Sequence, residues 1–211
     1  MTPSDERPHL GSLHEEWTWS FWAPDASLGG VISYRLIGAS NAWYTWALAR
    51  AGHPLLHVTE WDIPRRSDPM LAKAQAMWAE FVCDAPLEPW TVGNETYAVE
   101  LDDPADALGR AYGTAVPIAS DIEWYAVSPA AAINDGYEQA GVVHGTVELT
   151  DGAVDFAELA AWRTHRWSMA PLPPLVMPRA LAHVGLRSPI RYPDDSILDV
   201  VLTAGGWRSR G

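Results

Sequence analysis

The sequence predicts an all-β protein: one antiparallel barrel with a short helix and a C-terminal appendage. Three observations support this. Short segments of alternating apolar and polar residues follow one another closely along the chain. The turn Thr150-Asp151-Gly152 joins two of them as a hairpin. Only one short helix, residues 104–110, interrupts the pattern. Such spacing favours a sandwich or barrel over a βαβ fold, and a barrel of about eight strands has room for one small ligand.

The strand pattern recurs in about nine segments. In chain order they are 15–23, 28–37, 42–50, 55–63, 73–83, 90–101, 116–127, 141–149 and 154–167. Turn residues separate them, for example Pro24-Asp25 and the stretch 38–41. The segment 73–83 fits a helix as well as a strand buried on both faces. Asp102 or Asp103 is available as the N-cap of the short helix.

Three regions follow from this pattern. Residues 1–14 are polar and are expected to be a flexible N-terminus, and residues 15–168 form the barrel. Residues 169–211 begin with the proline-rich run APLPPLVMP, which predicts an extended linker. The appendage that follows contains one plausible strand, 197–203, and is too short for a second core. Because its apolar residues need cover, we expect a homodimer, with plugging of the barrel mouth as the alternative.

Composition and charge exclude several classes of function. The 211 residues contain 14 Lys+Arg against 27 Asp+Glu, a net charge of −13, which disfavours nucleic acids and anionic membranes. No apolar run is long enough for a membrane span, and the polar N-terminus lacks a signal-peptide core, so a cytoplasmic location is expected. Cys83 is the lone cysteine and there is no glycine-rich phosphate loop, so no metal and no cofactor are expected. The 12 tryptophans suit a lined apolar cavity or a thick core.

The first candidate cluster interrupts the strand 116–127. Alternation places Asp121, Glu123 and Tyr125 on one face, and Ile122 and Trp124 on the other. If the carboxylates point into the barrel, burial would raise at least one pKa and provide a general acid. The competing interpretation is a solvated outer face.

The second and third candidates lie on the last two barrel strands. Tyr137 precedes His144, which is more often a structural residue than a catalyst. Arg163, His165 and Trp167 share one face near the end of the final strand. Arg163 would depress the pKa of His165, and Trp167 can stabilise a cation through its ring face.

The order of these segments resembles a known superfamily. After the Trp-rich first strand come GGVISYRLIGASNAWYTWAL, MWAEFVCDAPLEPWTVGNETYAVELDDP, PIASDIEWY, YEQAGVVHGTVEL and WRTHRWS. This is similar to the lipocalin-like superfamily of carotenoid 1,2-hydratase (hydroxyneurosporene synthase), tocopherol cyclases and lipocalin-type Diels–Alderases. The resemblance covers about residues 14–168 and is nearest to actinobacterial-type members.

The resemblance implies a calycin-type barrel and chemistry on an apolar, polyene-like or isoprenoid-like molecule. Members typically carry an Arg-Asp-His-Ser-Trp-Gly stretch, matched here by Arg163 to Ser168, so the family's active-site His and Trp carry over to His165 and Trp167. The Asp of that stretch is Thr164 here, and the second barrel of the two-barrel relatives is missing.

The leading hypothesis is therefore a cyclase, hydratase or isomerase that acts on an apolar polyene, isoprenoid or polyketide-like molecule inside the barrel, without metal. The alternatives are a carrier of a hydrophobic small molecule and a purely structural partner. The expected catalytic residues are His165, Glu123 and Asp121. The expected substrate-binding residues are Trp167, Arg163, Trp124, Tyr125, His144, Tyr137, Trp17, Trp19, Tyr34 and Tyr44.

Overall fold

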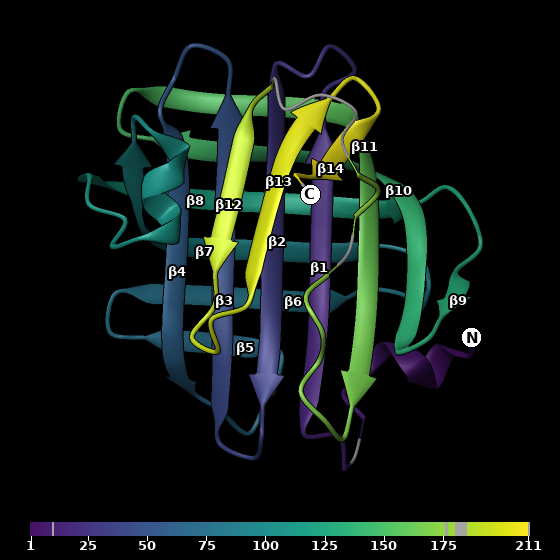
Figure 1. The fold of residues 1–211 in the computed structure, drawn as a ribbon. Helices are drawn as coiled ribbons and strands as arrows, with labels where there is room; N and C mark the ends of the chain where they lie inside the picture. The colour runs from purple at the N-terminus through teal and green to yellow at the C-terminus, as the bar shows by residue number, and fades with distance from the viewer. Residues whose placement is uncertain (10, 176, 180–184, 211) are drawn as a thin grey trace.

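Five long antiparallel strands form the front wall of the molecule in the computed structural model, which describes residues 1–9, 11–175, 177–179 and 185–210 (Figure 1). They are β1 (His14–Trp22), β2 (Leu28–Ile37), β3 (Asn41–Arg50), β4 (Leu55–Pro64) and β11 (Gly152–Ser168). In space the order is β4-β3-β2-β1-β11. The strands β1, β2, β3 and β4 pair in that order, each with its neighbour along the chain, because the turns between them are short.

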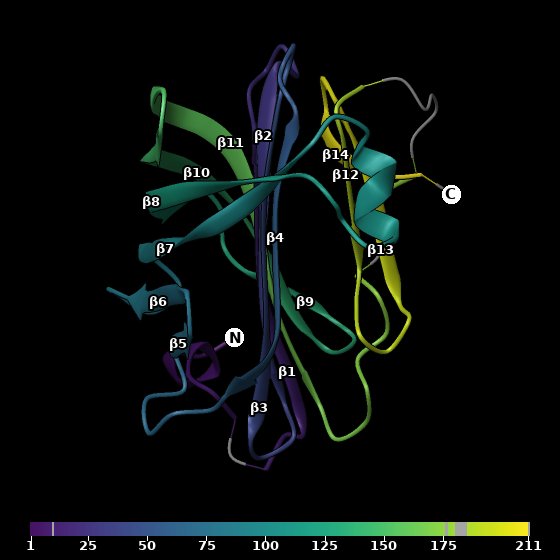
Figure 2. The same ribbon diagram turned by 90° about the vertical axis from the view of Figure 1, so that its left-hand side faces the viewer.

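The second wall crosses behind the first, almost at right angles to it (Figures 1 and 2). It contains β5 (Leu71–Ala74), β6 (Met77–Cys83), β7 (Trp90–Leu101), β8 (Thr114–Ala126) and β10 (Gly136–Leu149), with the short β9 (Ala131–Ile133) beside β10. The strand β10 pairs with β11 at one side of the barrel. On the other side, residues 55–57 of β4 pair with residues 99–101 of β7. These pairings close a ring of eight strands, so the predicted antiparallel barrel is confirmed.

Local departures from the expected elements have simple causes. The ambiguous segment 73–83 is a hairpin, β5 and β6, that turns at Gln75-Ala76. The described residues include two 3₁₀ helices, η1 (Pro3–Glu6) and η2 (Pro104–Leu108). The carboxylate of Asp103 accepts a hydrogen bond from the Ala105 amide, which confirms the predicted short helix and its cap. The unpredicted β9 is too short to show alternation.

Large aromatic side chains fill the barrel interior. Trp19 stacks on Phe81 with ring centroids 5.6 Å apart, and Phe81 stacks on Tyr34 at 4.6 Å. Gly30 is required at the back of this core, because a Cβ there would lie 2.3 Å from the Phe21 ring. The largest fully buried side chains include Trp17, Trp19, Trp46, Trp90, Trp124, Arg163, Tyr34, Tyr44, Tyr137 and Phe21. The tryptophans expected to line a cavity therefore pack mainly against one another and their neighbours.

The C-terminal residues form a third layer over the outside of the front wall (Figure 2). This small sheet contains β12 (Arg187–Arg191), β13 (Ile197–Thr203) and β14 (Gly206–Ser209). Its apolar residues, such as Val200 and Leu202, join Val31 and Trp43 in a second buried cluster. The indole of Trp207 donates to the Phe21 carbonyl at 3.1 Å. The strands of the front wall carry apolar residues on both faces, and the appendage covers their outer face.

This layer corrects the basis of the dimer prediction. Val200, Leu202 and Trp207 of the appendage are buried on their own barrel, so they do not require a partner chain. Ile197 is exposed, and Val176, Leu181 and Val184 lie outside the described residues. The appendage lies on the wall and does not plug the barrel mouth (Figure 2). Self-association stays a prediction, without an interface assigned to residues 169–211. Among the described residues, no helix has the length and apolar character needed to cross a membrane.

Candidate active site

Three polar side chains from distant parts of the chain meet at the lower end of the barrel, where β1 begins and β11 ends (Figure 1). They are His9 from the N-terminal segment, Glu15 from β1 and His165 from β11. Alternation along β1 places Glu15 on the inner face together with Trp17. The β1–β11 register sets Trp17 opposite His165, which brings the imidazole against the carboxylate. We call these three residues the His–Glu–His cluster.

The carboxylate of Glu15 is the centre of this cluster. Its Oε1 lies 2.8 Å from Nδ1 of His9 and 2.8 Å from Nε2 of His165. Its Oε2 accepts from the His9 backbone amide at 2.9 Å and from the Ser12 hydroxyl at 3.2 Å. The Glu15 side chain is buried, and both of its carboxylate oxygens accept hydrogen bonds.

The charges of the cluster follow from burial and hydrogen bonding. Burial alone would raise the pKa of Glu15, but hydrogen bonds from His165 and His9 outweigh it, so the pKa lies below its ordinary value. Burial lowers the pKa of His165 despite the neighbouring carboxylate. Because Glu15 is ionised and His165 is neutral, the proton of the His165 ring lies on Nε2. This N–H donates a hydrogen bond to Oε1 of Glu15. Burial, rather than the expected Arg163, depresses the pKa of His165.

The two histidines have different surroundings. His165 is 0% exposed, with its ring stacked on Trp17 at a centroid distance of 4.4 Å. His9 is only partly buried and stacks on Trp167 at 3.8 Å. Nδ1 of His9 faces Glu15, so the tautomer that donates from Nδ1 to the carboxylate has its lone pair on Nε2. His165 can position Glu15, whereas His9 can meet a ligand.

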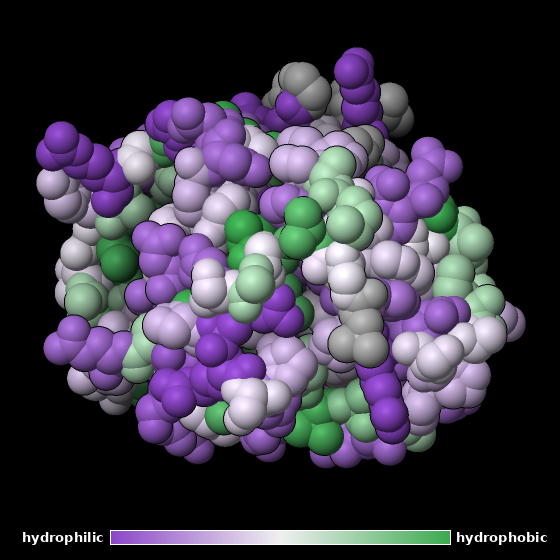
Figure 3. All heavy atoms as spheres, turned by 90° about the horizontal axis from the view of Figure 1, so that it is seen from below, coloured by the Kyte–Doolittle hydropathy of each residue, from purple (hydrophilic) through white to green (hydrophobic). Residues whose placement is uncertain are grey.

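A pocket of about 770 Å³ opens beside His9 at this end of the molecule. Figure 3 looks onto this end, where hydrophilic residues surround a few hydrophobic ones. We call the pocket beside His9 the lower-end pocket. It is lined by Arg7, Pro8, His9, Gly11, Ser12, Leu13, Gly38, Ala39, Arg65, Arg66, Asp68, Pro69 and Met70. Met70 also packs against the barrel core, and Pro69 accepts a hydrogen bond from the Tyr34 hydroxyl at 2.8 Å. The pocket therefore adjoins the aromatic interior.

The cluster also has the donor types of a metal site. One ligand atom from each of its residues lies within 4.8 Å of the other two, and two imidazoles with a carboxylate can hold Zn²⁺. Here both nitrogens approach the same oxygen at hydrogen-bond distance. That is the geometry of an anionic acceptor between two N–H donors.

A second buried charge lies deeper in the barrel. Arg163 donates to both carboxylate oxygens of Glu6, with Nη1 to Oε2 at 2.9 Å, and to the Gln139 side chain at 2.8 Å from Nη2. The Trp90 indole also donates to Glu6 at 3.1 Å. The N-terminal segment, expected to be flexible, thus inserts a buried carboxylate into the barrel. The physical reason is that Arg163, buried among aromatic rings, needs a counter-charge.

Several expected site residues face solvent instead. Ile122 and Trp124 occupy the interior, so Asp121, Glu123 and Tyr125 lie on the outer face of β8. The Tyr125 hydroxyl donates to Glu123 at 2.7 Å. His144 packs edge-on against Tyr125 on the same face. Asp121 and Glu123 are therefore not buried acids, and their assignment as catalytic residues is wrong for a site inside the barrel.

The remaining expected residues do face the interior. They are Arg163, His165, Trp167, Trp124, Tyr137, Trp17, Trp19, Tyr34 and Tyr44. Of these, only His165 belongs to the His–Glu–His cluster, and the rings of Trp17 and Trp167 contact it. Tyr44 and Tyr137 are deeply buried, and burial raises the pKa of each hydroxyl. They are not poised to exchange protons near neutral pH.

Sequence reasoning missed His9 and Glu15. A signal for Glu15 exists, because alternation from Trp17 and Trp19 puts it on the same inward face. No comparable signal marks His9, which lies in a polar segment without periodicity. Its place depends on how residues 7–9, 11 and 12 lie at the end of the barrel.

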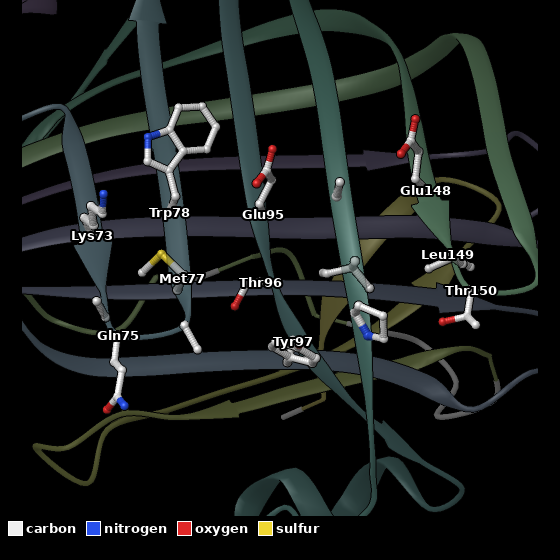
Figure 4. A pocket seen from close by; sticks show the side chains of 15 residues that line it. Lys73, Gln75, Met77, Trp78, Glu95, Thr96, Tyr97, Glu148, Leu149 and Thr150 are labelled. Carbon is white, nitrogen blue, oxygen red and sulfur yellow. The ribbon is translucent and has the colours of Figure 1, made fainter.

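Another pocket, of about 660 Å³, is lined by the β5–β6 turn, by residues within β7 and β8, and by the end of β10 (Figure 4). Glu95 and Glu148 come from different strands and point the same way as Trp78. Both carboxylates are exposed, and none of the expected site residues lines this pocket. It is an open acidic surface, in contrast to the buried His–Glu–His cluster.

Comparison with known proteins places the chain in a family. A family model described as a domain of unknown function (DUF7064) matches residues 2–170. No match was found among curated proteins or among solved structures. The matched region contains the whole barrel and the His–Glu–His cluster, and it ends before the small C-terminal sheet. Because the match covers far more than half of its length, the chain belongs to the DUF7064 family.

Proposed function

We propose that this protein is a metal-free cyclase, hydratase or isomerase that moves a proton on a small molecule with an apolar body. The observation that carries the proposal is the single oxygen of Glu15 held 2.8 Å from both imidazoles. A carboxylate hydrogen-bonded to one ring nitrogen fixes the tautomer and makes the other nitrogen a base. The likeness to carotenoid hydratases and their relatives agrees with this class of reaction.

The roles within the cluster follow from exposure. His9 lines the lower-end pocket, so its Nε2 accepts a proton from the ligand. Glu15 stabilises the resulting imidazolium, and the stacked ring of Trp167 adds cation–π stabilisation. In a cyclisation or isomerisation, the protonated His9 exchanges its proton with solvent and then gives a proton to another atom of the same molecule. In a hydration, water adds to the ligand and His9 passes the proton between them.

His165 is a positioning residue in this proposal. It is enclosed by Trp17, Tyr137 and Trp167, and it reaches a ligand only through Glu15. Its N–H holds Oε1 in place, so that His9 is presented in one orientation. The catalytic role expected for His165 is therefore assigned to His9 in this proposal.

Label uptake from D₂O tests the proposal across whole classes of candidate substrate. Polyene, isoprenoid and polyketide-like compounds are incubated with the protein in D₂O and followed by mass spectrometry. Proton transfer incorporates deuterium at carbon, and hydration adds the mass of D₂O. We expect turnover with the wild type, and a loss of about a hundredfold or more in His9→Gln.

The matched control is His144→Gln, which changes a histidine on the outer face of the barrel. It should keep the wild-type rate. Compounds that bind, as seen by quenching of Trp fluorescence, but take up no label would overturn the enzyme proposal and favour the carrier. Equal turnover in His9→Gln and the wild type would overturn the role of His9.

A further inference from the structure

The lower-end pocket concentrates positive charge in an acidic protein. The chain has a net charge of −13, yet Arg7, Arg65 and Arg66 line this one pocket against the single carboxylate of Asp68. Five other arginines form ion pairs: Arg35, Arg163, Arg166, Arg187 and Arg191. Within the described residues, the three pocket arginines lie beyond salt-bridge distance of any carboxylate.

Arg65 is held in place from behind. Its Nη1 donates to the Gly38 carbonyl at 2.6 Å, and its own backbone amide donates to the Ser40 carbonyl at 2.9 Å. These bonds tie it to the β2–β3 turn and leave the other guanidinium donors available. A planar guanidinium with free N–H groups fits a carboxylate or phosphate better than any neutral group.

The rest of the lining indicates the other half of the ligand. Leu13, Pro69 and Met70 give the pocket an apolar wall that continues into the barrel core through Met70. His9 also lines this pocket. An anionic group on the arginines would therefore leave an apolar chain beside the imidazole.

We propose that the lower-end pocket binds an amphiphilic anion, a carboxylate or phosphate monoester with an apolar body, through Arg65 and Arg66 with Arg7. This inference rests on the proposed function in that it names the substrate class of the same site. The negative charge of the whole chain disfavours anions elsewhere on the surface, so the three arginines provide selectivity as well as affinity.

The test uses three probes with the same apolar chain: octanoate, octyl phosphate and the neutral octanol. Binding is followed by Trp fluorescence, because Trp167 stacks on His9 at the pocket. We expect one or both anions to bind about tenfold or more tightly than octanol, with an affinity that falls as salt rises. The stronger of the two anions identifies the headgroup as carboxylate or phosphate.

Arginine variants locate the binding site. Arg65→Gln and Arg66→Gln should each weaken anion binding about tenfold, and Arg65→Lys, which keeps the charge, should weaken it less. Arg110→Gln is the matched control, since Arg110 lines a different pocket. The melting temperature of each variant confirms folding.

The outcomes separate this inference from the proposed function. Equal affinity for octanol and both anions, or unchanged anion binding in Arg65→Gln and Arg66→Gln, would overturn the anion site. Turnover of neutral compounds in the D₂O assay would still support the enzyme. Tight anion binding that depends on the arginines, without label uptake by any compound, would keep the site and overturn catalysis.

Discussion

Glu15 and Glu16 are neighbours on β1, and both are buried, but they face opposite sides of the barrel wall. Glu15 points inward and lies between two histidines. Glu16 points outward, beneath the C-terminal sheet, and pairs with Arg35 and Arg166. One carboxylate thus has imidazole partners, and the other has guanidinium partners that remain charged.

This difference separates proton chemistry from structural support. The guanidinium of Arg35 also lies 3.8 Å from the centre of the Tyr192 ring, which fixes it between the barrel and the appendage. Burial would raise the pKa of Glu16, but the charges of Arg35 and Arg166 outweigh it and hold the pKa low. Two arginines and one ionised carboxylate carry a net charge of +1, and neutralising Glu16 would leave both buried arginines without a counter-charge. The Glu15 cluster has no such excess, because His165 is neutral.

The largest expected effect comes from removing residues 169–211, which uncovers the Glu16 side and leaves the Glu15 side intact. The second apolar cluster would then face water, and burial of each such side chain contributes about 1.5–3 kcal/mol. Over the whole cluster, this loss is comparable to the total stability of a domain, about 5–15 kcal/mol. We expect the shortened chain to associate or aggregate, as measured by light scattering.

Full-length protein in the same buffer is the reference for this measurement. A shortened chain that is monomeric and melts as the full chain does would show that the appendage is dispensable. A full-length dimer that survives the truncation would place the predicted dimer interface on the barrel wall.

The next largest effect is expected from Glu16→Gln. This variant leaves Arg35 and Arg166 buried without a counter-charge, which costs about 3–5 kcal/mol. For a chain of this size, the melting temperature should fall by about 10 °C. Thermal unfolding followed by circular dichroism measures it, with Glu123→Gln on the exposed face of β8 as the control. A shift no larger than that of the control would mean that the network adds little stability.

Glu15→Gln should affect stability less and function more. The amide keeps one acceptor oxygen, so it can still accept from one histidine, and we expect a cost of about 1 kcal/mol. Turnover in the D₂O assay should fall about a hundredfold, because the amide neither fixes the His9 tautomer nor balances the imidazolium charge. Equal thermal destabilisation by Glu15→Gln and Glu16→Gln would contradict the division between the two sites.

The last expected effect concerns acid pH, where the difference between the wild type and Glu16→Gln should shrink. Because the pKa of Glu16 is lower in the folded state than its ordinary value of 4.5, Glu16 stabilises the fold above that value. This contribution is lost as the pH falls through the folded-state pKa. Urea unfolding at several pH values should therefore show the wild type and Glu16→Gln converging in stability well below pH 4.5. A constant difference across the acid range would exclude this linkage.

The sequence predicts most of the barrel because alternation survives in long strands. The ranges 28–37 and 90–101 agree with β2 and β7 to the residue. Alternation also places Arg163, His165 and Trp167 on one face, and the structure keeps them there. It cannot decide which face of β8 is internal, because both Asp121-Glu123 and Ile122-Trp124 alternate equally well. The closure of the sheet decides that the apolar pair is inside.

By itself, the amino-acid sequence determined the fold class, the positions of most barrel strands along the chain and the shared face of the β1 tryptophans, since each depends on local periodicity. Only the tertiary structure determined the active-site candidate. His9 and Glu15 are six positions apart in the chain, and His165 lies 150 residues beyond Glu15. Their meeting depends on the β1–β11 register and on the path of the N-terminal segment across the barrel end. Contacts between such distant residues carry no local signal, because burial and barrel closure, rather than spacing along the chain, bring them together.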